Sequence, residues 1–240
     1  MQHILGMYAF PCPPHDTVIE KLEDRLSGLK IIQIGHNRIE EFTRFAFVAY
    51  KNYMRESGSW RGTKKEFNEM LEKEKQLAPN SLIIALEHEK SKTIVAGIRG
   101  TKWTDGVTFP TEDKLGVSVF KIAREQNINP HKICHGSQQF INEDRLFELG
   151  YGYGCSKRIF LALFIHAICS MTLNDIELII AETDPITERN YGYLGIKWTP
   201  ASDWGDCMGL ARASILKIED VLKVKNFQHY LFPALAASSI

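Results

Sequence analysis

Residues 150–182 carry the pattern that most limits how this chain can fold. The run Gly150-Tyr-Gly-Tyr-Gly154 comes first, an apolar stretch from Ser156 to about Met171 follows, and Ile176–Glu182 completes the segment. The middle stretch is apolar on most sides, which predicts a helix buried in a core. The final stretch is the continuous apolar run of a strand covered on both faces. Because both must be buried, the segment predicts a sheet with a helical layer.

The rest of the chain supplies further elements of such a sheet. Apolar and alternating runs predict strands over residues 30–34, 81–87, 93–99, 132–141 and 208–218. Helical spacing and capping residues predict helices over residues 37–56, 64–76 and 117–126, after Asp184, and from Glu219. The helix over 64–76 is highly charged, so we expect one face of it to be solvated. This order favours an α/β fold of the α+β type, with a mixed sheet covered by helices.

Residues 1–29 are expected to form an N-terminal extension, and residues 30–240 a single domain. Three prolines within residues 11–14 interrupt regular structure, and Asp16 is a suitable cap for a short helix through about Leu29. A chain of 240 residues that is 44% hydrophobic can bury one large core.

Charge and cysteine usage argue against several classes of protein. Lys+Arg and Asp+Glu are both 29, so the chain has no net field that would hold nucleic acid. Five widely spaced cysteines with no C-x-x-C pair argue against a disulfide framework or a structural zinc site. The longest apolar run, Ile159–Ile168, is too short to span a bilayer. We therefore expect a cytoplasmic protein with no metal, no nucleic acid and no integral membrane segment.

The glycine run precedes the predicted buried helix directly. Glycines let backbone N–H groups approach a ligand closely, and the start of a helix favours negative charge. Gly150, Gly152, Gly154 and Ser156 therefore predict a cradle for a pyrophosphate or a phosphopantetheine arm, although a glycine-rich turn without ligand has the same pattern. The spacing is not G-x-G-x-x-G, which disfavours a dinucleotide fold. The same helix start would lower the pKa of Cys155.

The segment 188–198, Glu-Arg-Asn-Tyr-Gly-Tyr-Leu-Gly-Ile-Lys-Trp, resembles the last motif of the GNAT N-acyltransferases, where a short helix ends in Tyr-x-x-Leu-Gly-Phe. Residues 93–99 and 136–145 resemble strands of the acyl-homoserine-lactone synthases and long-chain N-acyl amino acid synthases. Residues 44–60 resemble the first helix of that group and its glycine–tryptophan end. The resemblance covers about residues 30–220 and implies a mostly antiparallel central sheet that splays between its fourth and fifth strands.

An N-acyltransferase activity is what the resemblance implies. The acyl donor would be acyl-CoA or an acyl-phosphopantetheine carrier protein, and the acceptor the amine of a small molecule such as an amino acid. The amine attacks directly, with no covalent enzyme intermediate. Tyr191 falls at the position of the tyrosine that protonates the leaving thiolate, although a packing role for Tyr191 and Tyr193 is the alternative. Phe140 and Ile141 fall where a backbone N–H would bind the carbonyl oxygen.

The acceptor side departs from the family pattern, because His135 and Gln138 replace a glutamate and an arginine. Arg99 does match and would hold a carboxylate bidentately, with a surface ion pair as the alternative. Ser137 and Gln138 would lie beside it as acceptor-binding residues. Three residues are candidates for the base that deprotonates the amine: Glu148, Glu182 and His135. A Cys155 nucleophile with His166 or His135 has no further support.

Two other functions remain open at this point. One is an enzyme similar to the acyl-homoserine-lactone synthases, and the other is a GNAT-fold protein that binds acyl thioesters without turnover. Arg145 lies five residues before Gly150, which makes the loop longer than in ordinary GNAT enzymes. A longer loop would suit a thioester presented on a carrier protein, to which Lys157 and Arg158 would offer positive charge.

Overall fold

The structure, a computed structural model, describes residues 10, 12–53, 61–152, 154–207 and 209–225. Within this part of the chain, nine strands form one sheet in the order β1-β2-β3-β4-β5-β6-β9-β7, with β8 pairing to β9. Only the β5–β6 pair is parallel, and every other neighbouring pair is antiparallel. The predicted mixed, mostly antiparallel sheet is therefore confirmed.

Apart from the helix expected after Asp16, the predicted strands and helices have counterparts close to their predicted ranges. The strands are β1 Thr17–Lys21, β2 Leu29–Gln33, β3 Ser81–His88, β4 Ile94–Lys102, β5 Ile133–Ile141, β6 Leu178–Thr183, β7 Thr199–Pro200, β8 Gly205–Asp206 and β9 Leu210–Lys217. The helices are α2 Ile39–Tyr53, α3 Lys64–Leu77, α4 Pro110–Leu115, α5 Val119–Gln126, α6 Glu143–Glu148, α7 Ser156–Leu173, α8 Pro185–Tyr193 and α9 Ile218–Leu222. The expected helix end at Glu56 and the Gly58–Trp60 segment lie outside the described residues.

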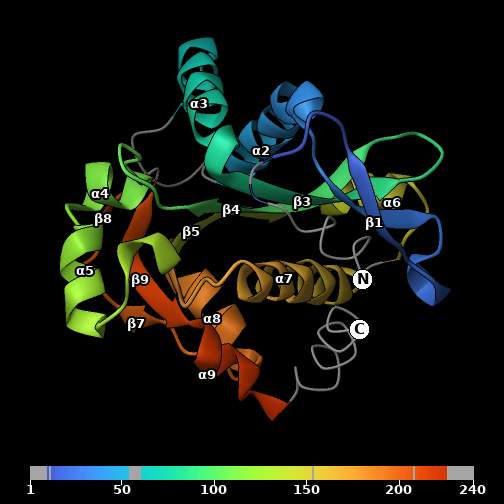
Figure 1. Ribbon diagram of the computed structural model, residues 1–240. Helices are drawn as coiled ribbons and strands as arrows, with labels where there is room; N and C mark the ends of the chain where they lie inside the picture. Colours follow the sequence, from blue (N-terminus) through green and yellow to red (C-terminus); the bar gives the residue numbers. More distant parts are fainter. Residues whose placement is uncertain (1–9, 11, 54–60, 153, 208, 226–240) are drawn as a thin grey trace.

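Helices cover both faces of the sheet, with α2 and α3 on one side and α7 on the other (Figure 1). Helix α7 packs against β3, β4 and β5, and Leu163, Phe164 and Ile168 enter the main core cluster. By length and composition α7 is the one helix among the described residues that could cross a membrane, and half of it is buried inside the protein. Its place in the core accounts for its apolar composition.

The sheet opens between β5 and β6. Their pairing runs from Ile133 opposite Leu178 to Gly136 opposite Ala181, and ends there. Strand β5 continues to Ile141 along β4, while β6 continues along β9. These are the fourth and fifth of the strands predicted from the sequence, so the predicted splay is confirmed.

A β-bulge lies in β5 at the opening. Gly97 pairs with Phe140 and Arg99 with Ser137, so the register shifts between them and β5 holds one extra residue. Gln138 is that residue, and its φ of 53° is in the left-handed region. As a result, Ser137 and Gln138 both contact residues on the α2–α3 face, whereas Gln139 contacts the opposite face.

The prediction of a helix after Asp16 is wrong. Thr17–Lys21 is β1, which pairs with β2, so these residues belong to the sheet and not to a separate extension. The Asp16 carboxylate accepts a hydrogen bond from the Gly35 N–H at 2.8 Å. Two further helices were not predicted: α4 lies in the expected loop over residues 101–115, and α6 fills the gap between β5 and the glycine run.

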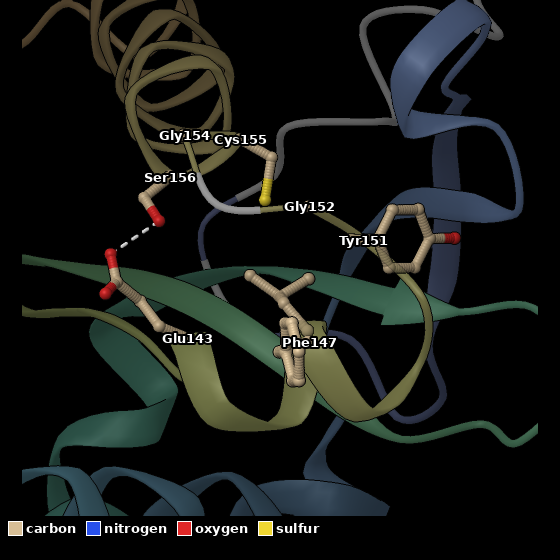
Figure 2. A pocket seen from close by; sticks show the side chains of 8 residues that line it. Glu143, Phe147, Tyr151, Gly152, Gly154, Cys155 and Ser156 are labelled. Atoms are coloured by element: carbon tan, nitrogen blue, oxygen red, sulfur yellow. Dashed lines mark hydrogen bonds between the residues drawn. The ribbon is translucent and has the colours of Figure 1, made fainter.

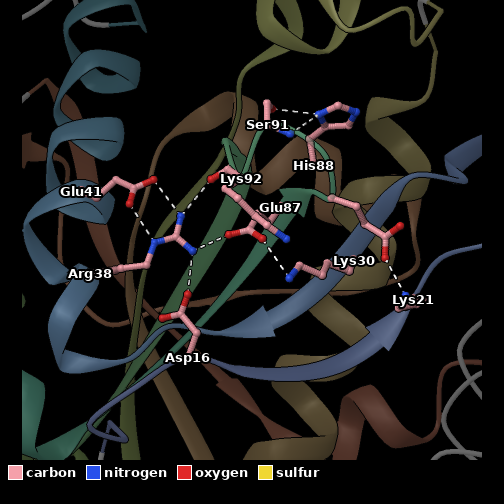
Figure 3. Close-up of polar contacts among 10 residues, drawn as sticks. Asp16, Lys21, Lys30, Arg38, Glu41, Glu87, His88, Ser91 and Lys92 are labelled. Atoms are coloured by element: carbon pink, nitrogen blue, oxygen red, sulfur yellow. Dashed lines mark hydrogen bonds and ion pairs between the residues drawn. The ribbon is translucent and has the colours of Figure 1, made fainter.

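Arg38 ties the first strand to the β3–β4 hairpin (Figure 3). Its guanidinium contacts Asp16 at 2.6 Å, Glu41 at 2.7 Å and the buried carboxylate of Glu87. The Lys30 ammonium lies 3.0 Å from the second oxygen of Glu87. Burial raises the pKa of Glu87, but the hydrogen bonds from Lys30 and Arg38 outweigh burial and hold the pKa below its ordinary value.

This cluster predicts a loss of stability in acid. Because the folded-state pKa of Glu87 is depressed, its stabilisation is fully present above the unfolded-state pKa and declines as pH falls below it. Replacing Arg38 by alanine should lower the free energy of unfolding by about 2 kcal/mol at pH 7 and by less at pH 3. Urea unfolding at the two pH values measures this, with Lys21→Ala at an exposed ion pair as the control. An Arg38→Ala deficit that is equal at both pH values would contradict the assignment.

Candidate active site

A buried polar cluster lies beside the opening, on the face of the sheet that α3 covers. Arg99 of β4 is 2% exposed and donates from Nε to Ser137 Oγ at 2.9 Å. Its guanidinium also forms an ion pair with Glu74 of α3. The same carboxylate accepts from the Gln138 amide at 2.7 Å. Arg99 therefore makes no surface ion pair, and Glu74 occupies the position that a substrate carboxylate was expected to take.

A second pair lies next to this cluster and joins β5 to β6. His135 Nε2 lies 3.0 Å from both carboxylate oxygens of Glu182. His135 is fully buried and stacks on Phe109. Burial raises the pKa of Glu182, but the charge and hydrogen bond of His135 outweigh burial and hold that pKa below its usual range. The Glu182 carboxyl is therefore ionised at neutral pH, and its side chain remains 17% exposed.

Tyr191 lies on the opposite face of the opening. Asp184 caps α8 by accepting from the N–H groups of Ile186 and Thr187, as predicted, and this helix carries Tyr191 back toward β5. The phenol ring contacts three aromatic rings at centroid distances of 5.1 to 5.5 Å: Phe160, Phe164 and Trp198. Its hydroxyl donates to the side-chain oxygen of Gln139. Burial raises the pKa of Tyr191, so the phenol stays protonated.

The glycine run forms one wall of a small pocket with α6 (Figure 2). Gly150 and Gly154 have φ values of 90° and 93°, which side chains rarely adopt. A Cβ atom added at Gly150, Gly152 or Gly154 would meet no heavy atom within 4 Å. The space beside these three residues is therefore open to a ligand. Ser156 donates to the Glu143 carboxylate at 2.6 Å across the pocket.

Comparison with known proteins adds the fold family. The sequence matches no family model and no curated protein. Among solved structures, FeeM, an N-acyl amino acid synthase from uncultured soil microbes, is similar over 84% of this chain and 99% of its own, at 13% identity and a TM-score of 0.54. A putative arylalkylamine N-acetyltransferase of the yellow fever mosquito is similar over 88% of this chain and 97% of its own, also at 13% identity and a TM-score of 0.54. The chain has the GNAT fold.

Within this GNAT fold, the predicted site residues separate into three groups. Arg99, Ser137 and Gln138 share one buried cluster, and Glu182 lies in the neighbouring pair. Tyr191 lies on the other face of β5, next to the opening. The loop residues of the predicted cradle form the third group: Gly150, Gly152, Gly154 and Ser156.

Glu148 is placed away from these groups by its contacts. Its side chain is 61% exposed on α6 and pairs with Arg145 at 2.7 Å. Among the described residues, the structure thus gives Glu148 no contact with either polar cluster.

Phe140 packs on Phe42 and Phe45 of α2, and Ile141 packs against the main core.

The predicted lowering of the Cys155 pKa is wrong. Burial and the charge of Glu143 raise the pKa of this thiol. His166 and His135 contact Glu20 and Glu182 instead. The five cysteines are free thiols, and no metal-binding group of three or more His, Cys, Asp or Glu is found among the described residues.

Sequence reasoning missed two residues of the site. Glu74 lies in a helix whose many charged residues are predicted to form a solvated face, yet Glu74 is 5% exposed. The helical spacing of Leu71, Glu74 and Leu77, which are all buried, was the available signal. Gln139, the partner of Tyr191, had no signal, because the bulge that turns it to the Tyr191 face is not visible in the sequence.

Proposed function

We propose that this protein is an N-acyltransferase that moves an acyl group from a pantetheine thioester to the amine of a small molecule. The observation that carries the proposal is the opening between β5 and β6, with the protonated Tyr191 on one face and the ionised Glu182 on the other. A thioester in this opening would present its sulfur to Tyr191 and its carbonyl carbon to an amine near Glu182.

The donor would be acyl-CoA or an acylated carrier protein. The open space beside Gly150, Gly152 and Gly154 fits the phosphate-bearing arm, since backbone N–H groups and a helix start attract anions. The backbone at Phe140 and Ile141 borders the opening on β5 and would supply a hydrogen bond to the thioester carbonyl. The exposed Lys157 and Arg158 at the start of α7 would suit an acidic carrier protein in the cytoplasm.

The chemistry balances with groups from the chain. The amine nitrogen bonds to the carbonyl carbon, the carbon–sulfur bond breaks, and the thiolate takes the Tyr191 proton. The nitrogen of the adduct is then positively charged, and its extra proton leaves through water to Glu182 and on to the Tyr191 phenolate, which returns both groups to their resting states. An acceptor that arrives as an ammonium first loses one proton to solvent through Glu182, so that its nitrogen can attack. Gln139 holds the Tyr191 hydroxyl before the donor enters, which fixes the position of the phenol. The hydrogen bond between Tyr191 and Gln139 is equally compatible with a protein that binds acyl thioesters without turnover.

Thiol release distinguishes enzyme from binder. The purified chain is incubated with acetyl, octanoyl and palmitoyl thioesters of CoA and of a carrier protein, each with a pool of amines and amino acids, and free thiol is measured over time. Release that requires an acceptor supports the proposal. A donor that raises the melting temperature without any thiol release favours the non-catalytic binder. Thiol release from the donor when S-adenosylmethionine is the acceptor favours the lactone-synthase alternative.

Gly152 provides a direct test of the donor loop. A Cβ atom at Gly152 would meet no heavy atom of the described residues within 4 Å and Gly152 does not need a positive φ, so Gly152→Val should fold. The side chain would instead fill the space of the donor, and we expect donor affinity to fall at least about tenfold, the factor that 1.4 kcal/mol represents. Calorimetric titration with CoA measures the affinity. Gly192→Val, at another open glycine that has no positive φ and does not line the pocket, controls for general effects, and unchanged CoA affinity in Gly152→Val would place the donor phosphates elsewhere.

A further inference from the structure

The charge of the polar cluster restricts which amine can be the acceptor. The guanidinium of Arg99 is the group that would be expected to bind a substrate carboxylate, but it is already paired with Glu74 and bonded to Ser137. Glu74 is 5% exposed and also accepts from Gln138, so it is firmly held in place. A substrate carboxylate would have to displace a buried partner to reach Arg99.

The ionisable groups of this region are Arg99 paired with Glu74, and Glu182 in contact with His135. Arg99 neutralises Glu74 at contact distance. Glu182 contacts His135 but remains 17% exposed, so its carboxylate is the group of this set that a ligand can reach. A cationic group could pair with the exposed part of this carboxylate, whereas an anion would meet a like charge there.

Two buried side-chain atoms of β5 have no hydrogen-bond partner among the described residues. Gln138 is 5% exposed and His135 is fully buried, yet the Gln138 side-chain oxygen and His135 Nδ1 have no partner. A buried acceptor without a donor is costly, and each such atom in a folded protein calls for an explanation. An ammonium or amine group of a ligand would supply the N–H donor that the Gln138 oxygen lacks.

We propose that the acceptor is a primary amine without a carboxylate, whose ammonium group pairs with Glu182 and donates to the side-chain oxygen of Gln138. This inference rests on the proposed N-acyltransferase function and gives it a substrate class: decarboxylated, cationic amines in preference to amino acids. The bulge places Gln138 and Gln139 on opposite faces of β5, so the amine and Tyr191 lie on opposite sides of the thioester carbon.

Matched pairs of acceptors test the inference. Tyrosine and tyramine, tryptophan and tryptamine, and lysine and cadaverine are compared by thiol release with one acyl-CoA, together with tyrosine methyl ester, in which only the carboxylate charge is removed. We expect kcat/KM for each amine to exceed that of its parent amino acid at least tenfold, with the ester close to tyramine. Equal or faster reaction of the amino acids overturns the inference and leaves the acyl transfer intact. If no acceptor is turned over, calorimetric titration gives the dissociation constants of tyramine and tyrosine, and tyramine should bind at least tenfold more tightly.

Two variants separate this role from a structural one. Glu182→Gln should raise KM for tyramine and bring the tyramine-to-tyrosine ratio toward one, whereas Glu177→Gln, an exposed carboxylate next to β6, should change neither. Glu74→Gln removes the charge that neutralises Arg99 and should shift the ratio toward tyrosine at least tenfold. Melting curves show whether Glu74→Gln folds. An unchanged ratio in Glu182→Gln overturns the inference even if Glu74→Gln is unfolded.

Discussion

Replacing Tyr191 by phenylalanine is expected to lower kcat about 100-fold or more and to leave the KM for the acyl donor nearly unchanged. The expectation follows from the loss of a general acid, an effect commonly of 10²–10⁴. The phenylalanine ring keeps the contacts with Phe160, Phe164 and Trp198, so only the hydroxyl is lost. Because burial raises the pKa of Tyr191, the wild-type rate should not decline at the ordinary pKa of a tyrosine.

Tyr193 provides the matched control for this substitution. It lies two residues further along α8 and is 75% exposed, so Tyr193→Phe should leave kcat unchanged. Tyr191→Phe also leaves the Gln139 oxygen without its donor, at a cost of about 1–3 kcal/mol, which a melting curve checks. Steady-state kinetics with saturating acceptor gives the two parameters. A Tyr191→Phe enzyme with wild-type kcat would remove the tyrosine from the mechanism and leave it a packing residue.

The order of elements was predictable because it depends on local patterns. The continuous apolar runs within Ser81–His88 and Ile94–Lys102, the apolar α7 and the Asp184–Pro185 cap each indicate their structure within a few residues. Strand β1 was not predictable in this way. Its exposure alternates weakly, and Thr17–Lys21 is a strand because β2 offers an unpaired edge, which is a tertiary effect.

The site was predictable only in part, for a related reason. Tyr191 and Arg99 stand in motifs, so their positions followed from resemblance. Their contacts were not predictable in the same way. Tyr191 contacts Gln139, which the bulge at Gln138 turns toward it, and the partner of Arg99 is Glu74, which lies 64 residues before Gln138. A pairing across that separation leaves no periodicity in the sequence. The expected carboxylate-binding arginine is therefore present, but its charge is already neutralised.

Replacing Arg99 by alanine is expected to lower the free energy of unfolding by about 3–5 kcal/mol, the usual cost of breaking a buried ion pair from one side. Arg99 is among the largest fully buried side chains, and its removal leaves Glu74 buried without its cationic partner and bonded to the Gln138 amide. Urea unfolding at pH 7 measures the change. Arg44→Ala, which removes an exposed pair with Glu40, should cost less than about 1 kcal/mol and serves as the control.

The double variant Arg99→Leu with Glu74→Leu tests the cause of that loss. If the single variant is unstable because it strands a charge, removing both charges and filling the space with apolar side chains should recover most of the stability, because two desolvated ions are replaced by packing. Recovery would be incomplete, since the Gln138 amide loses its acceptor. A double variant as unstable as Arg99→Ala would show that the volume of the arginine, and not its charge, stabilises the junction of α3 and β4.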